Sequence, residues 1–111
     1  MPLRALRVSL GTGQTLTEVL PAAVERDYLG GRGAATWMLA NQMPSTTGPL
    51  SPANLLIFSA GPLAGTGIPA TGGFVASTRS PLTRLLAHSW AEGRWGGALR
   101  RAGYDLLVLE G

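Results

Sequence analysis

The stretch from Leu50 to Asp105 contains four loop motifs: LSPAN (Leu50–Asn54), GPLAGTG (Gly61–Gly67), TRSPLT (Thr78–Thr83) and AGYD (Ala102–Asp105). Short apolar segments separate these motifs. Because glycine and proline mark turns, the pattern predicts short strands and helices joined by tight loops. None of the four motifs is diagnostic alone, so the fold assignment depends on their order and spacing together.

The N-terminal half predicts a β-hairpin followed by two helices. Apolar and polar residues alternate over Leu6–Leu10, and Thr15–Leu20 is also extended in character, with a glycine turn between the two segments. Pro21 suits the first turn of a helix that Gly30-Gly31 would end. We expect a second short helix over Ala34–Gln42, followed by a loop.

The C-terminal half predicts three strands and one helix. Leu55–Phe58 lacks alternation, which is typical of a strand buried on both faces. Further strands are expected over Phe74–Thr78 and Tyr104–Leu109, with a short helix over Trp95–Ala102 between them. The segment 81–92 is ambiguous. We therefore predict an α+β fold in which β structure predominates, with residues 1–111 forming a single domain or part of one.

Composition excludes several classes of function. All nine basic residues are arginines and the net charge is +3, but the arginines are scattered except for Arg100-Arg101. A nucleic-acid binder usually carries a basic stripe, so no nucleic-acid partner is expected. The chain has no cysteine, which rules out disulfides, zinc–thiolate sites and iron–sulfur ligation by its own residues.

The distribution of apolar residues gives an expected location. No apolar run approaches the roughly 20 residues that a membrane span needs, and no signal peptide is recognisable. We therefore expect a cytoplasmic protein with no membrane partner. Only 14% of the residues are charged, which favours a surface partly covered by another domain or subunit.

The local motifs give little support for chemistry by this chain alone. Gly61–Gly67 and Gly30–Gly33 are expected to be structural turns, with a phosphate-binding loop as the alternative, since neither matches a P-loop or a dinucleotide fingerprint. His88 is the only histidine, and we expect a packing or surface role rather than acid–base catalysis. Ser80 and Ser89 lack a nucleophile-elbow context. We predict no catalytic residue and no metal-ligand set.

The three tryptophans are candidates for packing or recognition. Trp37, Trp90 and Trp95 are more typical of core or interface anchors than of stacking platforms. Trp90 and Trp95 flank Glu92–Arg94, so an alternative hypothesis places both indoles on one pocket wall.

The four motifs, together with YLGGRG (Tyr28–Gly33), closely resemble the N-terminal domain of tungsten-pterin aldehyde:ferredoxin oxidoreductases. The resemblance runs from the Arg4–Leu10 segment to Glu110. It implies a domain that forms a base for a tungsten or molybdenum bis-pyranopterin. Later domains of that family hold the pterins and supply the cysteines of a four-iron cluster, which passes electrons to ferredoxin. The family's first domain continues further, so we expect a part of it or a short relative.

The resemblance also implies a set of cofactor-binding residues. Gly73 aligns with a family arginine that lies between pterin and cluster, and Arg79 or Arg94 could substitute for it. Trp90 aligns with an asparagine whose backbone carbonyl helps to hold magnesium between pterin phosphates, a contact that survives a change of side chain. Glu92 replaces a small residue and is unfavourable near phosphates without a cation. The candidates are Gly72, Gly73, Arg79, Trp90, Ala91, Glu92, Gly93 and Arg94.

These observations leave three hypotheses of function. In the first, the chain supports the cofactor of an oxidoreductase and is inactive without the remaining enzyme domains or a partner subunit. In the second, it is a non-enzymatic module of the same fold that binds a partner protein or a second copy of itself. In the third, its glycine loops and arginines bind a small anion or nucleotide.

Overall fold

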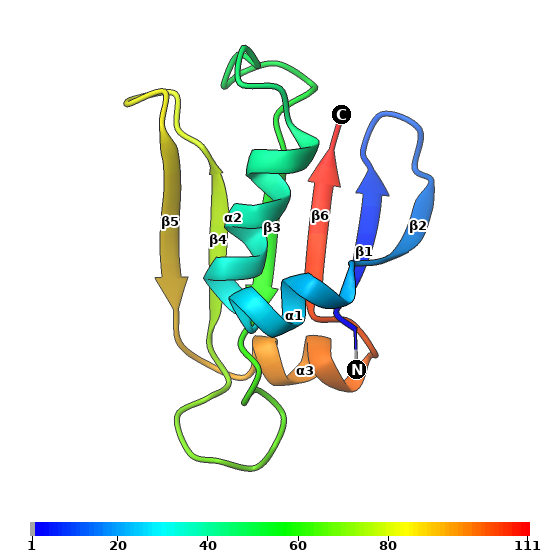
Figure 1. Cartoon of the computed structure of the whole chain (residues 1–111), viewed down its shortest axis with the longest axis vertical. Coiled ribbons are helices and arrows are strands. Elements are labelled where there is room, and N and C mark those ends of the chain that lie inside the picture. Colours follow the sequence, from blue (N-terminus) through cyan, green and yellow to red (C-terminus); the bar gives the residue numbers. More distant parts are fainter. Residues whose placement is uncertain (1) are drawn as a thin grey trace.

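The computed structural model describes residues 2–111, in which six strands form one mixed sheet and three helices pack on it (Figure 1). The α+β prediction is confirmed. Across the sheet the strand order is β2-β1-β6-β3-β4-β5. The elements are β1 (Arg4–Ser9), β2 (Thr15–Val19), α1 (Ala22–Tyr28), α2 (Gly31–Gln42), β3 (Leu56–Ala60), β4 (Phe74–Arg79), β5 (Leu86–Ala91), α3 (Trp95–Arg101) and β6 (Leu106–Glu110).

The last strand lies in the middle of the sheet. β6 runs parallel to β1, with Ala5 opposite Leu106, and antiparallel to β3, with Phe58 opposite Leu107. The other neighbouring pairs are antiparallel. The β1–β2 pair confirms the predicted N-terminal hairpin.

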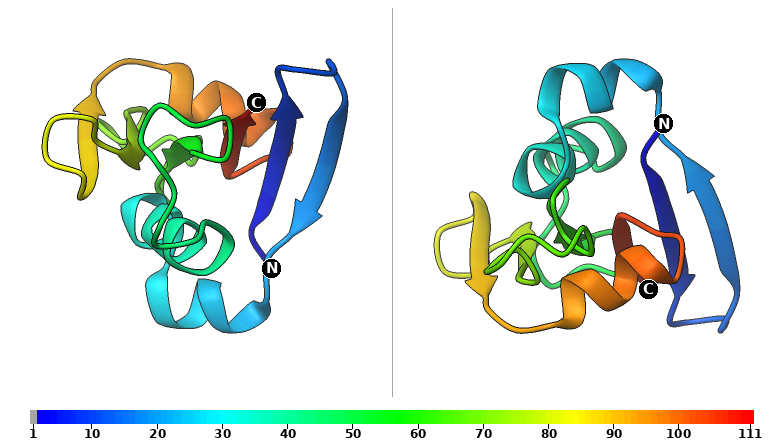
Figure 2. Two further views of the ribbon diagram at one scale, coloured as in Figure 1. Left: turned by 90° about the horizontal axis from the view of Figure 1, so that it is seen from above. Right: turned by 90° about the horizontal axis from the view of Figure 1, so that it is seen from below.

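The hydrophobic core lies between α1, α2 and one face of the sheet. α3 lies on the opposite side of the sheet, as the two views of Figure 2 show. Side chains of a strand alternate between the two faces of the sheet, so every second residue points toward α2. The fully buried core side chains include Val24, Met38, Leu39, Ile57, Leu106 and Val108.

The other face of the central strands is also apolar. α3 covers one end of it, where the ring centroids of Phe58, Phe74 and Trp95 lie 4.7–5.8 Å apart. Because apolar residues occupy both faces of β6 and β3, this sheet has the composition of a layer covered on both sides. We call the following partly exposed residues the apolar sheet face: Leu6, Val8, Leu56, Phe58, Leu107 and Leu109.

The LSPAN and TRSPLT motifs form hydrogen bonds that stabilise the loops at the upper edge of the sheet in Figure 1. Asn54 Nδ2 donates to the carbonyl of Pro49 at 2.8 Å, and its Oδ1 accepts from Thr78 Oγ1 at 3.3 Å. Ser80 Oγ accepts the backbone N–H of Leu82 at 3.1 Å and so closes the β4–β5 turn. These side chains replace backbone partners that the loops lack, so the motifs are structural.

The AGYD motif joins several elements at the lower edge of the sheet. The Asp105 carboxylate accepts the backbone N–H of Arg4 at 2.9 Å and pairs with Arg100 of α3 at 2.7 Å. The Asp105 carbonyl also accepts the N–H of Ala60 at 2.9 Å. Gly103 has φ +96°, a conformation that favours glycine in the turn before Asp105. One residue therefore joins β1, β3, α3 and β6.

Two sequence-based expectations need correction, and one ambiguous segment is now assigned. Gly31 begins α2 and does not end the preceding helix, because α1 already ends at Tyr28. Leu56 and Phe58 are only half-buried, so β3 is not buried on both faces in this chain. The ambiguous segment contains β5, whose turn and pairing with β4 were not recognisable from periodicity.

We predict that Asp105→Ala lowers the free energy of unfolding by about 2 kcal/mol, because it removes an ion pair and a charge-assisted hydrogen bond at a mostly buried carboxylate. Urea denaturation followed by circular dichroism measures the change. The control is Asp27→Ala, which removes an exposed ion pair with Arg26 and should leave the midpoint almost unchanged. Equal midpoints for both variants would contradict the role of Asp105.

Candidate functional site

Two cavities meet at the start of β4, at the lower edge of the sheet. The first has a volume of about 420 Å³ and its lining is largely apolar, so we call it the apolar cavity. The second has a volume of about 460 Å³, and we call it the arginine cavity after Arg94 and Arg101. Gly72 lines the arginine cavity, Gly73 lines the apolar cavity, and Ala70 and Thr71 line both.

The apolar cavity lies between the α1–α2 corner and the ends of the strands. The corner contributes Tyr28–Gly33, the loop after β3 contributes Gly61–Ala64, and Trp90 comes from the end of β5. The remaining lining residues are Ser59, Ala70, Thr71, Gly73, Phe74 and Val75. Because helix α2 begins at this corner, the positive end of its dipole faces the same space.

The arginine cavity has the chemistry of an anion site. Glycines dominate its lining, and no acidic residue of the described chain lines it. Within residues 2–111, neither Arg94 nor Arg101 forms an ion pair. A Cβ at Gly93, where φ is +127°, would have no atom within 4 Å, so a ligand can approach the backbone there.

Trp90 lies directly against Gly73. A Cβ added to Gly73 would lie 2.9 Å from Cζ2 and 3.1 Å from Cε2 of Trp90, and 2.7 Å from the carbonyl oxygen of Ala91. The indole therefore occupies space that a side chain at position 73 would need. Trp90 is 59% exposed, and it forms a wall of the apolar cavity.

Most of the residues predicted to bind a cofactor lie at this junction. Gly72, Gly73, Trp90, Gly93 and Arg94 line one cavity or the other, and Ala91 pairs with Phe74 beside them. Glu92 is exposed on the same loop and lines neither cavity.

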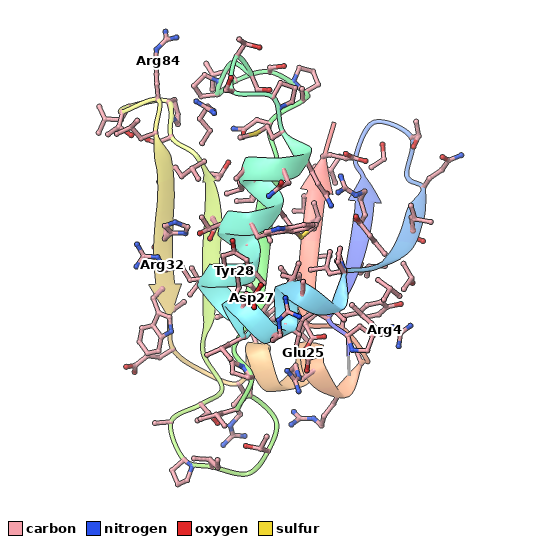
Figure 3. The ribbon with its side chains drawn as sticks, viewed as in Figure 1. Arg4, Glu25, Asp27, Tyr28, Arg32 and Arg84 are labelled. Atoms are coloured by element: carbon pink, nitrogen blue, oxygen red, sulfur yellow. The ribbon has the colours of Figure 1, made fainter. Side chains whose placement is uncertain are left out.

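Arg79 is separated from this group. It ends β4, whereas Gly73 precedes the start of that strand, and its Nη1 donates to the carbonyl of Arg84 at 2.9 Å. Arg84 marks the upper edge of the sheet in Figure 3, opposite the two cavities. Of the two arginines predicted to substitute at position 73, only Arg94 is placed near it.

Other residues at the junction did not emerge as site candidates from the sequence. Arg32 and Arg101 bring charge to the two cavities. Their signals were the YLGGRG motif and the Arg100-Arg101 pair, but neither motif shows which cavity its arginine faces. The suggestion that Trp90 and Trp95 share a pocket wall is wrong, because Trp95 packs on Phe58 and Phe74 and does not line the apolar cavity.

His88 has a packing environment and not that of a catalytic base. Its Nδ1 lies 2.8 Å from Oγ of the buried Ser77, and its Nε2 lies 3.5 Å from Thr36 Oγ1. Partial burial lowers the pKa of His88, and the positive charge of Arg32 lowers it further. No group of three histidine, cysteine, aspartate or glutamate side chains within residues 2–111 could hold a metal ion.

Comparison with known proteins agrees with this architecture. The family described as "Aldehyde ferredoxin oxidoreductase, N-terminal domain" matches residues 5–111. The chain is 42% identical over 108 residues to a tungsten-containing aldehyde ferredoxin oxidoreductase of Pyrococcus furiosus, and 38% identical to one of Thermococcus kodakarensis. Each match covers 97% of this chain and 18% of the relative. The chain therefore spans less than a fifth of the length of these relatives.

A solved structure has the same fold. It is the active-site complex of a benzoyl coenzyme A reductase with 1,5-dienoyl-CoA, and one of its chains superposes with a TM-score of 0.89 at 39% identity. The match covers 97% of this chain and 16% of that chain.

Among residues 2–111, no helix has the length and apolar character that crossing a membrane requires.

The lowered pKa of His88 predicts a pH dependence of folding. Since the unfolded chain binds a proton near pH 6.5 and the folded chain only at lower pH, stability should be full above pH 6.5 and fall as the pH drops below it. Thermal melting between pH 7.5 and 5.5 measures this slope. His88→Gln should flatten the slope, and Arg32→Gln should raise the NMR-derived pKa of His88. An unchanged slope in the His88 variant would contradict the assignment.

The contact between Gly73 and Trp90 predicts a coupled pair. Gly73→Ala should cost about 2 kcal/mol, because its methyl group meets both the indole and the Ala91 carbonyl. In the Trp90→Ala background the cost should be smaller by at least about 0.5 kcal/mol, since only the carbonyl clash remains. A double-mutant cycle by urea denaturation measures the difference. Strict additivity would show that the indole does not fill this space.

Proposed function

The chain belongs to the aldehyde ferredoxin oxidoreductase family, and we propose that it is the cofactor-supporting part of a tungsten or molybdenum bis-pterin oxidoreductase. The observation that carries the proposal is the junction of the two cavities, where residues from β4, β5 and the loop before α3 meet. Gly72 and Gly73 precede β4, Trp90 comes from the end of β5, and Gly93 and Arg94 belong to the loop before α3. In this proposal the chain is inactive alone, because it supplies a surface and no redox centre.

The arginine cavity fits the phosphorylated part of such a cofactor. Arg94 and Arg101 offer guanidinium donors that suit phosphate oxygens, and the open backbone at Gly93 permits close approach. A magnesium ion between phosphates would be held with the backbone carbonyl of Trp90. Glu92 on the same loop adds a carboxylate, which favours such a cation over bare phosphates. The cofactor, when bound, supplies the redox chemistry.

The apolar sheet face is the proposed contact with the rest of the enzyme. It lies on the central strands and is partly exposed in this chain, although its composition suits burial. The relatives are several times longer, and the similar solved chain is part of a complex. Since this chain has no cysteine, the iron–sulfur cluster that passes electrons to ferredoxin must come from those other domains or a partner subunit.

A second candidate is a binding module without redox function. The observation that favours it is the Trp90 indole, which occupies the space of a side chain at Gly73 and makes this edge of the sheet more apolar. An exposed tryptophan beside an apolar cavity is typical of a binding anchor. In this case the same fold binds a partner protein and no pterin.

The proposed function predicts that metal content depends on partner domains. The 111-residue chain purified alone should contain no stoichiometric tungsten or molybdenum and should not reduce a viologen dye with an aldehyde. The chain produced together with the cysteine-bearing domains, in a host that makes the pterin, should copurify with iron and with tungsten or molybdenum. Elemental analysis by mass spectrometry and dye reduction measure both properties.

A variant of the apolar sheet face tests whether this face contacts the other domains. Leu107→Lys places a charge on the apolar sheet face and should abolish copurification and metal content, while the circular dichroism spectrum stays unchanged. A complex that forms stoichiometrically but contains no pterin metal would support the binding module. Metal and aldehyde-dependent activity in the chain alone would contradict the proposed division of roles.

A further inference from the structure

We propose that the apolar cavity binds a small planar aromatic anion, with its ring against Trp90 and its charged group toward Arg32. The proposed function assigns the phosphorylated part of the cofactor to the arginine cavity, and this inference goes beyond it because it concerns the apolar cavity. It requires neither the pterin nor another domain. The arginine cavity on the other side of Gly72 is not involved.

The size and walls of the cavity suit a small organic ligand. Its volume of about 420 Å³ is at the lower end of the range for ligand sites, about 300–1,000 Å³. Leu63, Ala64 and Val75 provide apolar surface from the loop after β3 and from β4. Such walls favour a compact hydrophobic ring over a sugar or an extended polar chain.

Trp90 gives the cavity an aromatic wall. Gly73 has no side chain, and the six-membered ring of the indole occupies the space beside its backbone. The aromatic contacts of the described chain join Phe58, Phe74 and Trp95, so Trp90 has no ring partner among residues 2–111. A large indole that is 59% exposed at a cavity can stack with a planar ring.

Arg32 determines the preferred charge of the ligand. Among the residues of the described chain that line the cavity, it is the only one with a full charge. It is exposed and forms no ion pair within residues 2–111. Figure 3 shows its side chain extending from the start of α2 toward β5. Its effect on the pKa of His88 shows that its positive charge reaches that strand.

Backbone conformation indicates that the cavity is preformed. Three non-glycine residues of the described chain have positive φ, and two of them, Leu29 at 67° and Ala70 at 62°, line this cavity. Such conformations cost energy and persist where the surrounding structure holds them in place. A preformed cavity does not lose affinity through ordering of its own walls.

The test is a titration of the ¹⁵N-labelled 111-residue chain with 2-naphthoate, followed by NMR. Shifts should be confined to the Trp90 indole N–H and to backbone amides around the cavity, such as Gly61 and Gly73. The neutral analogue 2-naphthalenemethanol should bind about fivefold more weakly, since it lacks the charge-assisted contact with Arg32. The amide spectrum of each variant verifies its fold.

Two variants and two matched controls test the assigned contacts. Trp90→Ala should weaken naphthoate binding about tenfold, while Leu82→Ala, at a still more exposed apolar residue in the β4–β5 turn, should not. Arg32→Gln should remove the preference for the anion, while Arg84→Gln, on the opposite edge of the sheet, should keep it (Figure 3).

Several results would overturn the inference. These are an absence of saturable shifts, shifts located elsewhere, equal affinity for the anion and the neutral analogue, and undiminished binding by folded Trp90→Ala. Tighter saturable binding of a neutral phenylalanine-containing peptide than of naphthoate would assign the cavity to a protein side chain instead. Each of these outcomes leaves the metal-content test of the proposed function unaffected, so the two proposals can fail separately.

Discussion

The pairing of β6 with β1 is the interaction on which the rest of this structure depends. It brings Arg4 and Asp105, which are 101 residues apart in sequence, into direct hydrogen bonding. Without it the N-terminal hairpin would have no neighbour in the sheet, since β1 and β2 otherwise pair only with each other. Asp105 strengthens this closure by also holding α3 and the end of β3. The closure of so long a loop costs chain entropy, which several short-range contacts at one point help to offset.

This closure also positions the candidate site. The end of β3, the start of β4, the end of β5 and the start of β6 all lie at one edge of the sheet, because β3 and β5 run opposite to β4 and β6 (Figure 1). The loops that leave this edge contain most of the glycines discussed above. They form both cavities, while Asn54 and Ser80 at the opposite edge form hydrogen bonds within the chain. The edge at which Asp105 joins the strands is therefore also the edge that carries the two cavities of the candidate site.

Much of the fold could be predicted from the sequence, because turns and strands leave local signals. The hairpin, both N-terminal helices, α3 and the strands β3, β4 and β6 were recognised within a few residues. β5 was missed because its residues, LAHSWA, do not alternate cleanly and its partner strand determines its conformation. The order of the strands also depends on contacts between distant segments, which a single sequence does not reveal.

The site was predictable only in part. The family resemblance identified Gly73 and Trp90 as two separate departures from the family's residues. The structure shows that they are linked, because the absence of a side chain at Gly73 leaves space for the Trp90 indole. Arg79 was a reasonable candidate by sequence distance, yet a strand of six residues carries it to the opposite edge. The most direct test is anomalous scattering at the tungsten or molybdenum edge from crystals of the chain bound to the cysteine-bearing domains that the proposed function requires. We expect a metal peak facing the edge formed by Gly72, Gly73 and the Trp90–Arg94 segment. A metal peak beside a different edge of this chain would contradict the proposed position of the cofactor.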